Sequence, residues 1–269
     1  MKPIRVAIVH PGEMGTSIGA ALQGRAVFAG NGRSAATRDR AAADGLDDVG
    51  SLERLVEVAE IIISVCPPGS AEDVALQIAA LGFSGCYVDA NAIAPSTARS
   101  IGEIAQAAGA RFVDGGVIGP PARREGTTRL WLAGEHAPAV AELFAGSLVD
   151  ARILDGPIGS ASALKMAYAA WTKGSTALLS ATVDLAVAEG VSDSLLEEWA
   201  VSQPEIARTW TRRIDAARPK AWRFVGEMEE IAASFAACDL PSGFHDAAAE
   251  VYRALAQAPR KDDESVESG

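Results

Sequence analysis

The stretch that decides the fold reads Ile4-Arg-Val-Ala-Ile-Val9, then His10-Pro-Gly-Glu-Met-Gly15, then Thr16-Ser-Ile-Gly-Ala-Ala-Leu22. We interpret it as a short apolar strand, a tight turn and the start of a helix. Gly12 would let the backbone approach a pyrophosphate, and Gly15 would let the helix pack closely on the strand. The free N–H groups at the start of that helix would face the anion. The stretch therefore predicts a dinucleotide-binding corner, although His10 replaces the usual first glycine of Gly-x-Gly-x-x-Gly.

Composition narrows the class of protein. A chain of 269 residues with 49% apolar residues can bury a substantial core in one or two domains. The net charge of −11 argues against broad binding to nucleic acids or anionic membranes. We expect no signal peptide, and no apolar run reaches the roughly 20 residues that a membrane span needs. Three widely spaced cysteines indicate reduced thiols in a cytoplasmic protein, and three scattered histidines form no zinc pattern.

The first half of the chain alternates strand and helix signals, which predicts a parallel α/β sheet. We expect strands at 4–9, 26–29, 61–65, 86–89, 112–114 and 129–133, and helices at 16–22, 35–43, 52–58, 71–81, 95–109 and 137–146. Helical signals alone follow, at 162–188, 195–202, 206–217, 224–237 and 247–256. The chain is thus expected to hold a Rossmann domain at 1–159, a helical domain at 160–257 and a disordered tail at 258–269.

Four loops are expected at the carboxyl ends of the strands, where ligands bind in an open parallel sheet. They lie at Gly12, at Cys66-Pro67-Pro68, at Asn91 and at Gly119. The Asn91 amide can donate and accept a hydrogen bond at once, which suits a nicotinamide carboxamide or a substrate hydroxyl, although an Asx turn before a helix is the alternative. Gly115-Gly-Val-Ile-Gly119 is expected to be a flexible loop whose N–H groups bind a carboxylate, or else an ordinary turn.

Lys165 is the strongest catalytic candidate. It lies near the start of the long helix, among small and apolar residues. A partly buried ammonium group would have a lowered pKa and exchange protons near neutrality, whereas a lysine that reaches solvent would not. Tyr168, three residues later, shares this helix face and would assist proton transfer or simply pack.

The residues after the second strand select the type of cofactor. This segment reads Gly30-Asn31-Gly32-Arg33-Ser34 and holds no Asp or Glu for a ribose hydroxyl. Asn31, Arg33 and Ser34 instead suit a 2′-phosphate, so we expect NADP rather than NAD.

These motifs together resemble the β-hydroxyacid dehydrogenase superfamily, which includes 3-hydroxyisobutyrate and 6-phosphogluconate dehydrogenases. Its motifs look like Gly12-Glu13-Met14-Gly15, Asp89-Ala-Asn-Ala-Ile-Ala-Pro95, Asp114-Gly-Gly-Val-Ile-Gly-Pro120 and Gly159-Ser-Ala-Ser-Ala-Leu-Lys165. The resemblance implies that Lys165 is the general acid/base, that Ile118, Gly119 and Pro120 lie on the substrate loop, and that dimers share an active site.

The chain also departs from the superfamily pattern. Ile118 replaces the serine of the substrate loop, Ala161 replaces a glycine, and Ala169 replaces an asparagine. The Lys-Asp pair usual in the last domain has no clear counterpart near Glu227. We therefore expect a divergent branch of the superfamily with its own substrate. Trp222 and His245 lie in segments that are expected to line the substrate site. The alternative is that these segments only form a helical core.

The predicted function is an NADP-dependent oxidoreductase that transfers hydride between nicotinamide and the hydroxyl/carbonyl pair of a small hydroxyacid-like compound. One alternative is an imine reductase on the same scaffold, against which Lys165 argues. Another is a non-catalytic NADP(H)-binding regulatory protein. The very apolar helix at 162–188 further predicts a homodimer.

Overall fold

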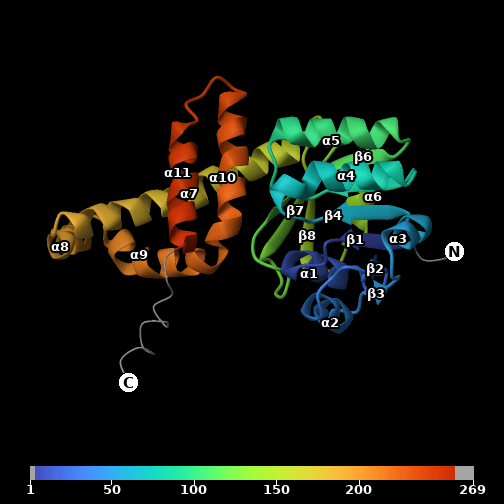
Figure 1. Cartoon of the computed structure of the whole chain (residues 1–269), viewed down its shortest axis with the longest axis horizontal. Helices are drawn as coiled ribbons and strands as arrows, with labels where there is room; N and C mark the ends of the chain where they lie inside the picture. Colours follow the sequence, from blue (N-terminus) through green and yellow to red (C-terminus); the bar gives the residue numbers. More distant parts are fainter. Residues whose placement is uncertain (1–3, 258–269) are drawn as a thin grey trace. The chain divides into compact units, whose positions relative to one another are not determined.

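The computed structural model describes residues 4–257. They form two compact units that divide between Met166 and Ala167, inside one long helix (Figure 1). The first unit is α/β and the second is all helical. The predicted fold class is therefore confirmed, whereas the tail expected at 258–269 lies outside the described residues. Within residues 4–257, no helix combines the length and the apolar character that a membrane span needs.

An eight-stranded sheet is the centre of the first unit, in the order β3-β2-β1-β4-β5-β6-β7-β8. All neighbouring strands pair in parallel except β6 and β7, which are antiparallel. Its first six strands follow the order of a doubly wound dinucleotide fold, in which the order of the strands in the sheet reverses between β1 and β4. The strands are β1 (Val6–Val9), β2 (Ala26–Phe28), β3 (Asp47–Asp48), β4 (Ile61–Ser64), β5 (Cys86–Asp89), β6 (Arg111–Ile118), β7 (Thr128–Ala133) and β8 (Val149–Ile153).

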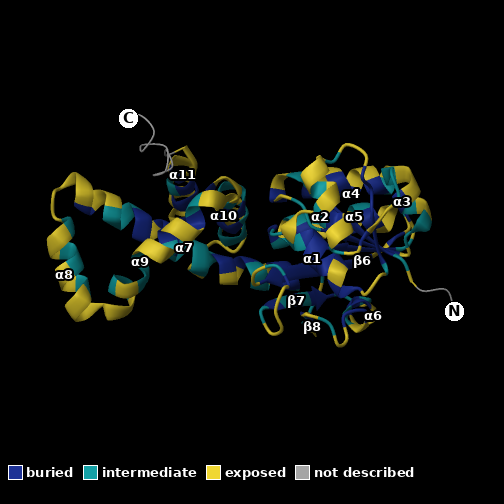
Figure 2. Cartoon of the chain, turned by 90° about the horizontal axis from the view of Figure 1, so that it is seen from below, coloured by how far each residue is buried: buried dark blue, intermediate teal, exposed yellow. Residues whose placement is uncertain are grey.

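Helices cover both faces of this sheet and enclose two hydrophobic cores. The helices are α1 (Glu13–Ala21), α2 (Ala35–Ala43), α3 (Leu52–Val58), the 3-10 turn η1 (Pro68–Ser70), α4 (Ala71–Ala80), α5 (Pro95–Ala107) and α6 (Ala137–Glu142). Side chains of α1, α2 and α6 share one core, and side chains of α3, α4 and α5 share the other. The central strands are consequently buried on both faces, as Figure 2 shows.

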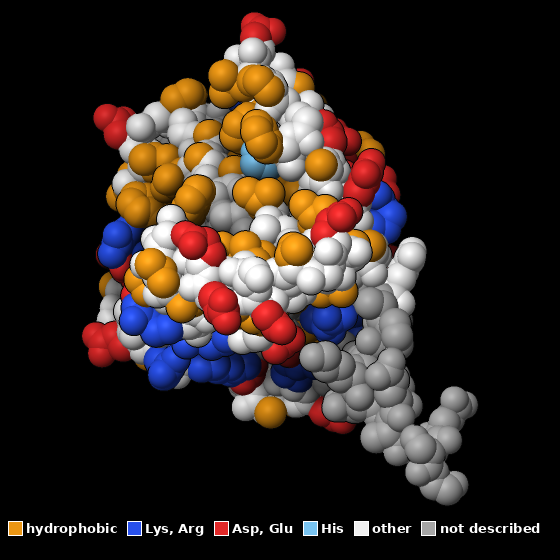
Figure 3. Space-filling model, turned by 90° about the vertical axis from the view of Figure 1, so that its left-hand side faces the viewer, with side chains coloured by type: hydrophobic (Ala, Val, Ile, Leu, Met, Phe, Trp, Pro, Cys, Tyr) orange, Lys and Arg blue, Asp and Glu red, His pale blue; other side chains and the backbone are white. Residues whose placement is uncertain are grey.

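The second unit contains helices only. It comprises α7 (Ser160–Ala188), which begins in the first unit, α8 (Ser192–Ser202), α9 (Pro204–Ala217), the 3-10 turn η2 (Arg218–Lys220), α10 (Ala221–Ala236) and α11 (Gly243–Gln257). The last two helices pack through buried Met228, Ile231 and Tyr252, with Phe224 edge-on to the Tyr252 ring at 5.2 Å. Hydrophobic side chains also gather on the surface of this unit (Figure 3), and Trp171, Leu178 and Leu185 of α7 are among the exposed ones.

The structure corrects one prediction that bears on the site. Residues 115–118, expected as part of a flexible loop, continue β6, and Val117 and Ile118 are buried. This extension pairs with β7 from Asp114↔Ala133 to Ile118↔Arg129. The glycines suggested a loop, but the backbone here approaches its neighbours closely: a Cβ on Gly115 would lie 2.7 Å from the Asp89 carbonyl oxygen. Gly115 and Gly116 are therefore packing positions in a strand.

Candidate functional site

The turn between β1 and α1 forms the corner that the sequence predicted. The Gly12 N–H donates to the His10 carbonyl oxygen at 2.8 Å, and His10 has a left-handed backbone with φ of 63°. A Cβ on Gly15 would lie 2.8 Å from that same oxygen, so α1 requires glycine there. A Cβ on Gly12 would meet nothing within 4 Å, which leaves open space beside the start of α1. Glu13 and Met14 form the first turn of this helix.

The loop after β2 places a half-buried cation, Arg33, near the corner. The Arg33 Nε has no hydrogen-bond partner among residues 4–257. Burial lowers the pKa of the Arg33 guanidinium. Ser34 caps α2, its Oγ accepting the Thr37 N–H at 3.2 Å, and Asn31 is exposed. A desolvated cation of this kind is stabilised by an anionic ligand.

Sequence reasoning missed an acid at this loop. Asp48 lies at the end of β3, and its Oδ1 accepts the N–H groups of Gly30 at 2.9 Å and Gly50 at 2.8 Å. The pairing of β3 with β2 brings this carboxylate next to the segment 30–34, which itself contains no Asp or Glu. Arg33 and Asp48, which carry opposite charges, therefore both lie where residues that distinguish NADP from NAD are expected.

Asn91 ties together the ends of β4 and β5. Its Nδ2 donates to Ser64 Oγ at 3.2 Å and to Asp89 Oδ2 at 2.7 Å, and its Oδ1 accepts the Cys66 N–H at 2.5 Å. The residue is 2% exposed. Both amide hydrogens are engaged, and one lone pair of Oδ1 remains for a ligand. The observed arrangement fixes the loop at Cys66, Pro67 and Pro68; a direct contact of Asn91 with cofactor stays a prediction.

Cys66 itself is a protonated thiol in this setting, because burial raises its pKa to about 11. Its Sγ lies 3.8 Å from Ser64 Oγ. A thiol with so high a pKa is a weak nucleophile at neutral pH. The Cys66 loop therefore offers backbone carbonyl groups rather than thiol chemistry.

Asp114 of β6 holds the start of α7. Its Oδ2 accepts the N–H groups of Gly159, Ala161 and Ser162 at 2.9, 2.8 and 3.2 Å, and its Oδ1 accepts the Ser162 hydroxyl at 2.6 Å. Burial raises the pKa of Asp114, and these hydrogen bonds act in the opposite direction. The carboxylate satisfies backbone donors that a helix start would otherwise leave unpaired.

This cap fixes the position of Lys165, in the second turn of α7. The half-buried ammonium group donates to the Val117 carbonyl oxygen of β6 at 2.8 Å. A Cβ on Gly116 would lie 2.7 Å from the Ala161 carbonyl oxygen and 3.2 Å from Lys165 Cβ, so helix and strand are in close contact. Lys165 Nζ is thus held near the carboxyl end of β6.

The turn after β6 is closed by its own hydrogen bonds. Thr128 Oγ1 donates to the Pro120 carbonyl oxygen at 2.7 Å. Gly119 has φ of 122°, and a Cβ there would clash with the Thr127 carbonyl oxygen. Ile118, immediately before, is 5% exposed. The expected contacts of Ile118, Gly119 and Pro120 with substrate stay predictions.

Comparison with known families agrees with this geometry. Residues 5–143 match the family described as the NAD binding domain of 6-phosphogluconate dehydrogenase. The chain belongs to this family. Residues 186–255 match a domain of unknown function, DUF1932. The family match covers the corner, the Arg33 loop and the Asn91 loop, and it confirms the resemblance to the β-hydroxyacid dehydrogenase superfamily.

Relatives extend the likeness over the rest of the chain. An uncharacterised 28.5 kDa protein of Methanothermus fervidus is 31% identical over 168 residues, and the match spans 62% of this chain and 63% of that protein. A conserved protein of unknown function, described as structurally similar to 3-hydroxyacid dehydrogenases, has 26% identity and a TM-score of 0.68 over 95% of this chain and 100% of its own. A Mycobacterium tuberculosis 3-hydroxyisobutyrate dehydrogenase with L-serine shares the fold, with 20% identity and a TM-score of 0.65 over 94% of each chain.

Three predicted site residues lie in the helical unit. Tyr168 and Trp222 are exposed, and His245 is buried against the Phe235 ring with a centroid distance of 4.4 Å. The same unit contains an ion pair that sequence reasoning did not find, between Lys173 of α7 and the buried carboxylate of Glu227 on α10. Lys173 Nζ also lies 4.7 Å from the Phe224 ring centroid. Lys173 is therefore engaged in the packing of this unit.

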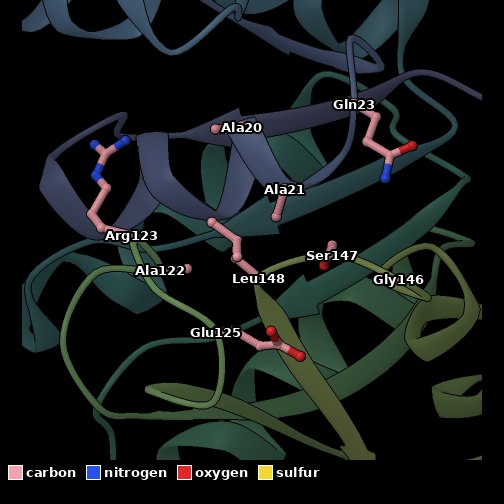
Figure 4. A pocket seen from close by; sticks show the side chains of 9 residues that line it. All are labelled: Ala20, Ala21, Gln23, Ala122, Arg123, Glu125, Gly146, Ser147 and Leu148. Carbon is pink, nitrogen blue, oxygen red and sulfur yellow. The ribbon is translucent and has the colours of Figure 1, made fainter.

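A hollow of about 520 Å³ opens elsewhere on the α/β unit (Figure 4). It lies beside the last turn of α1 and is lined by Ala20, Ala21, Gln23, Ala122, Arg123, Glu125, Gly146, Ser147 and Leu148. The Arg123 guanidinium is paired with Asp44 at 2.6 and 2.7 Å. None of the predicted site residues lines this hollow, so we do not place the reaction there.

Proposed function

We propose that this protein is an NADP-dependent oxidoreductase that acts on the hydroxyl/carbonyl pair of a small hydroxyacid-like substrate. The observation that carries the proposal is the position of Lys165, held near the carboxyl end of β6 in a unit of dinucleotide-binding family and topology. Ligands of open parallel sheets bind outside the carboxyl ends of the strands. A lysine at that edge is suited to a proton transfer next to the cofactor.

The residues of the corner fit a dinucleotide. Gly12 has open space beside the first turn of α1, where backbone N–H groups can bind a pyrophosphate. Arg33, whose buried Nε has no partner among the described residues, supplies positive charge for a 2′-phosphate, and Asn31 and Ser34 lie on the same loop. The nicotinamide of a bound cofactor supplies the hydride chemistry.

The chain's own groups then have distinct tasks. Lys165 Nζ takes the hydroxyl proton during oxidation and returns it during reduction. Asn91 holds the Cys66-Pro67-Pro68 loop against the cofactor, and the turn at Gly119 and Pro120 orients the substrate. Ile118, where the superfamily has serine, favours a substrate different from the usual ones.

Replacement of the lysine tests this proposal. Purified protein is incubated with NADP⁺ and a panel of small hydroxyacids, and with NADPH and a panel of aldehydes, ketones and imines. Lys165→Met keeps the length and apolar bulk of the side chain but removes the transferable proton. The kcat on the best substrate is therefore expected to fall about 10²–10⁴-fold. NADPH affinity should change little, because the pyrophosphate is bound at Gly12–Gly15.

Lys220→Met, at an exposed lysine of η2, is the matched control and should leave kcat unchanged. Circular dichroism on each preparation confirms the fold. Near-normal turnover by folded Lys165→Met would end the case for Lys165. Turnover of imines alone would indicate an imine reductase, and NADPH binding without turnover of any panel member would favour a regulatory protein.

A further inference from the structure

His10 is the residue of the corner that the proposed function does not use. It occupies a position where dinucleotide-binding turns usually have glycine, in a left-handed conformation that a non-glycine residue adopts at a cost. Its side chain is half-buried, and no residue among 4–257 hydrogen-bonds to its Nδ1, which is shielded from solvent. A buried polar nitrogen without a partner is unfavourable unless a ligand supplies one.

A second such atom lies nearby, on Arg33. Its Nε is also buried without a partner among the described residues. Burial, together with the positive charge of Arg33, lowers the pKa of the His10 imidazole to about 4. The free protein therefore holds a neutral imidazole beside a guanidinium, with one nitrogen of each side chain unsatisfied. An anion with several oxygen atoms would satisfy both.

We propose that His10 and Arg33 together bind a phosphate group of the dinucleotide cofactor, and that His10 takes up a proton from solvent when this phosphate binds. The inference rests on the proposed function, because it concerns the same cofactor site. A phosphate adds up to two negative charges next to the imidazole, which favours the imidazolium. Both nitrogens of the imidazolium are donors, so Nδ1 then donates to a phosphate oxygen.

Other titratable and charged groups lie on the surrounding elements. Cys66 at the end of β4 has a pKa raised to about 11 by burial, so it stays protonated near neutral pH. Asp89 of β5 is fully buried and accepts hydrogen bonds from Asn91. Glu13, in the first turn of α1, is exposed. Arg33 remains a cation at all relevant pH values.

The linkage has a definite sign. A group whose pKa is raised by ligand binding strengthens that binding as pH falls below the pKa of the bound state, until the pKa of the free state is reached. NADPH affinity should therefore rise as pH falls from about 8 toward 6, by up to about tenfold per pH unit. The phosphate itself titrates near pH 6, so the comparison of wild type with a His10 variant isolates the imidazole.

Calorimetric titration of the full chain with NADPH tests the proposal. Titrations at pH 7.0 in PIPES and in Tris, which differ in ionisation enthalpy and contain no phosphate, give the number of protons taken up. Wild type should take up roughly half a proton or more per site. His10→Asn tolerates the left-handed backbone and still hydrogen-bonds but cannot be protonated there; its uptake should be near zero and its NADPH affinity about tenfold lower.

His136→Asn, which removes a histidine that precedes α6, is the matched control and should behave as wild type. His10→Gly restores the usual residue of the turn and replaces His10→Asn if that variant does not fold. Titrations of wild type and the His10 variant with 2′-AMP and with ADP identify the phosphate. If the variant loses affinity for 2′-AMP alone, His10 binds the 2′-phosphate. If it loses affinity for ADP alone, His10 binds the pyrophosphate.

Tight NADPH binding by wild type and His10→Asn alike, with equal proton uptake, would overturn the inference and leave the proposed function intact. Failure of wild type to bind NADPH or NADH would instead overturn the proposed function. Because these two results differ in the wild-type titration, one failure is not mistaken for the other.

Discussion

The charge at the adenosine end of the proposed cofactor site depends on two residues, Arg33 and Asp48. Arg33→Ala removes a half-buried cation, so NADPH binding should weaken by about 1.5–3 kcal/mol while NADH binding changes little. Asp48→Asn keeps an oxygen for the Gly30 and Gly50 N–H groups but removes a negative charge. Because Asp48 is exposed, its effect is smaller: the preference for NADPH should rise by about 0.2–1 kcal/mol.

Fluorescence titration of each variant with both cofactors measures these ratios. An NADPH/NADH ratio that stays the same in Arg33→Ala would contradict the assignment to NADP. Asp48→Ala, which loses the two backbone hydrogen bonds as well as the charge, separates the electrostatic effect from a distortion of the loop.

Single residues differ in how visible they are to sequence reasoning. Arg33 and Lys165 were predicted because each lies at a fixed position relative to a local motif. Asp48 and Glu227 were missed because their partners, Gly30 and Lys173, are brought to them by strand pairing and helix packing. The Asn91 amide was identified, but its engagement with Ser64 and Cys66 depends on the neighbouring strand end. Local patterns therefore gave candidates, whereas partners required the fold.

At the level of elements, periodicity located the helices and the buried strands but not the edges of the sheet. β8 was missed because Asp150 and Arg152, which form an ion pair and are partly exposed, interrupt any apolar pattern. β3 was missed because it has only two residues. The extension of β6 was missed because its two glycines indicated a loop, although both are required by close packing. The strands that carry the corner and the Asn91 loop were predicted, since these are buried.

Asp114 links the integrity of one element to function. Asp114→Ala would leave the N–H groups of Gly159, Ala161 and Ser162 without their acceptor, so the free energy of unfolding should fall by about 2–4 kcal/mol. Since the same contacts position Lys165, kcat should fall as well, while NADPH affinity is kept. Thermal unfolding and steady-state kinetics on one preparation measure both.

Ser51→Ala is the control for this prediction. Ser51 Oγ caps α3 by accepting the Arg54 N–H at 3.2 Å, and its loss should cost about 1 kcal/mol without changing kcat. If Asp114→Ala lost stability but kept full turnover, the cap would be a folding device with no bearing on the lysine.

For the whole molecule, the exposed face of α7 predicts self-association. Trp171, Leu178 and Leu185 follow one another at intervals of seven residues, which places them on one helix face, and they are 76%, 65% and 62% exposed. Apolar side chains aligned in this way are unfavourable in water and usually cover a partner surface. A two-fold dimer would bury the face against its own copy, since one surface then serves both subunits. We therefore predict a homodimer joined through α7.

Light scattering during size-exclusion chromatography at micromolar concentration measures the mass directly. Leu178→Glu with Leu185→Glu should shift wild-type dimer to monomer, because each burial that is lost removes about 1.5–3 kcal/mol and adds a charge to an apolar contact. Val201→Glu, on α8, changes an equally apolar side chain that is 83% exposed but lies off this face, and it should remain dimeric. A monomeric wild type would contradict the prediction. If the protein stayed dimeric with Leu178→Glu and Leu185→Glu but became monomeric with Val201→Glu, the interface would lie on α8. Only a side chain buried in the interface responds in this way to a new charge.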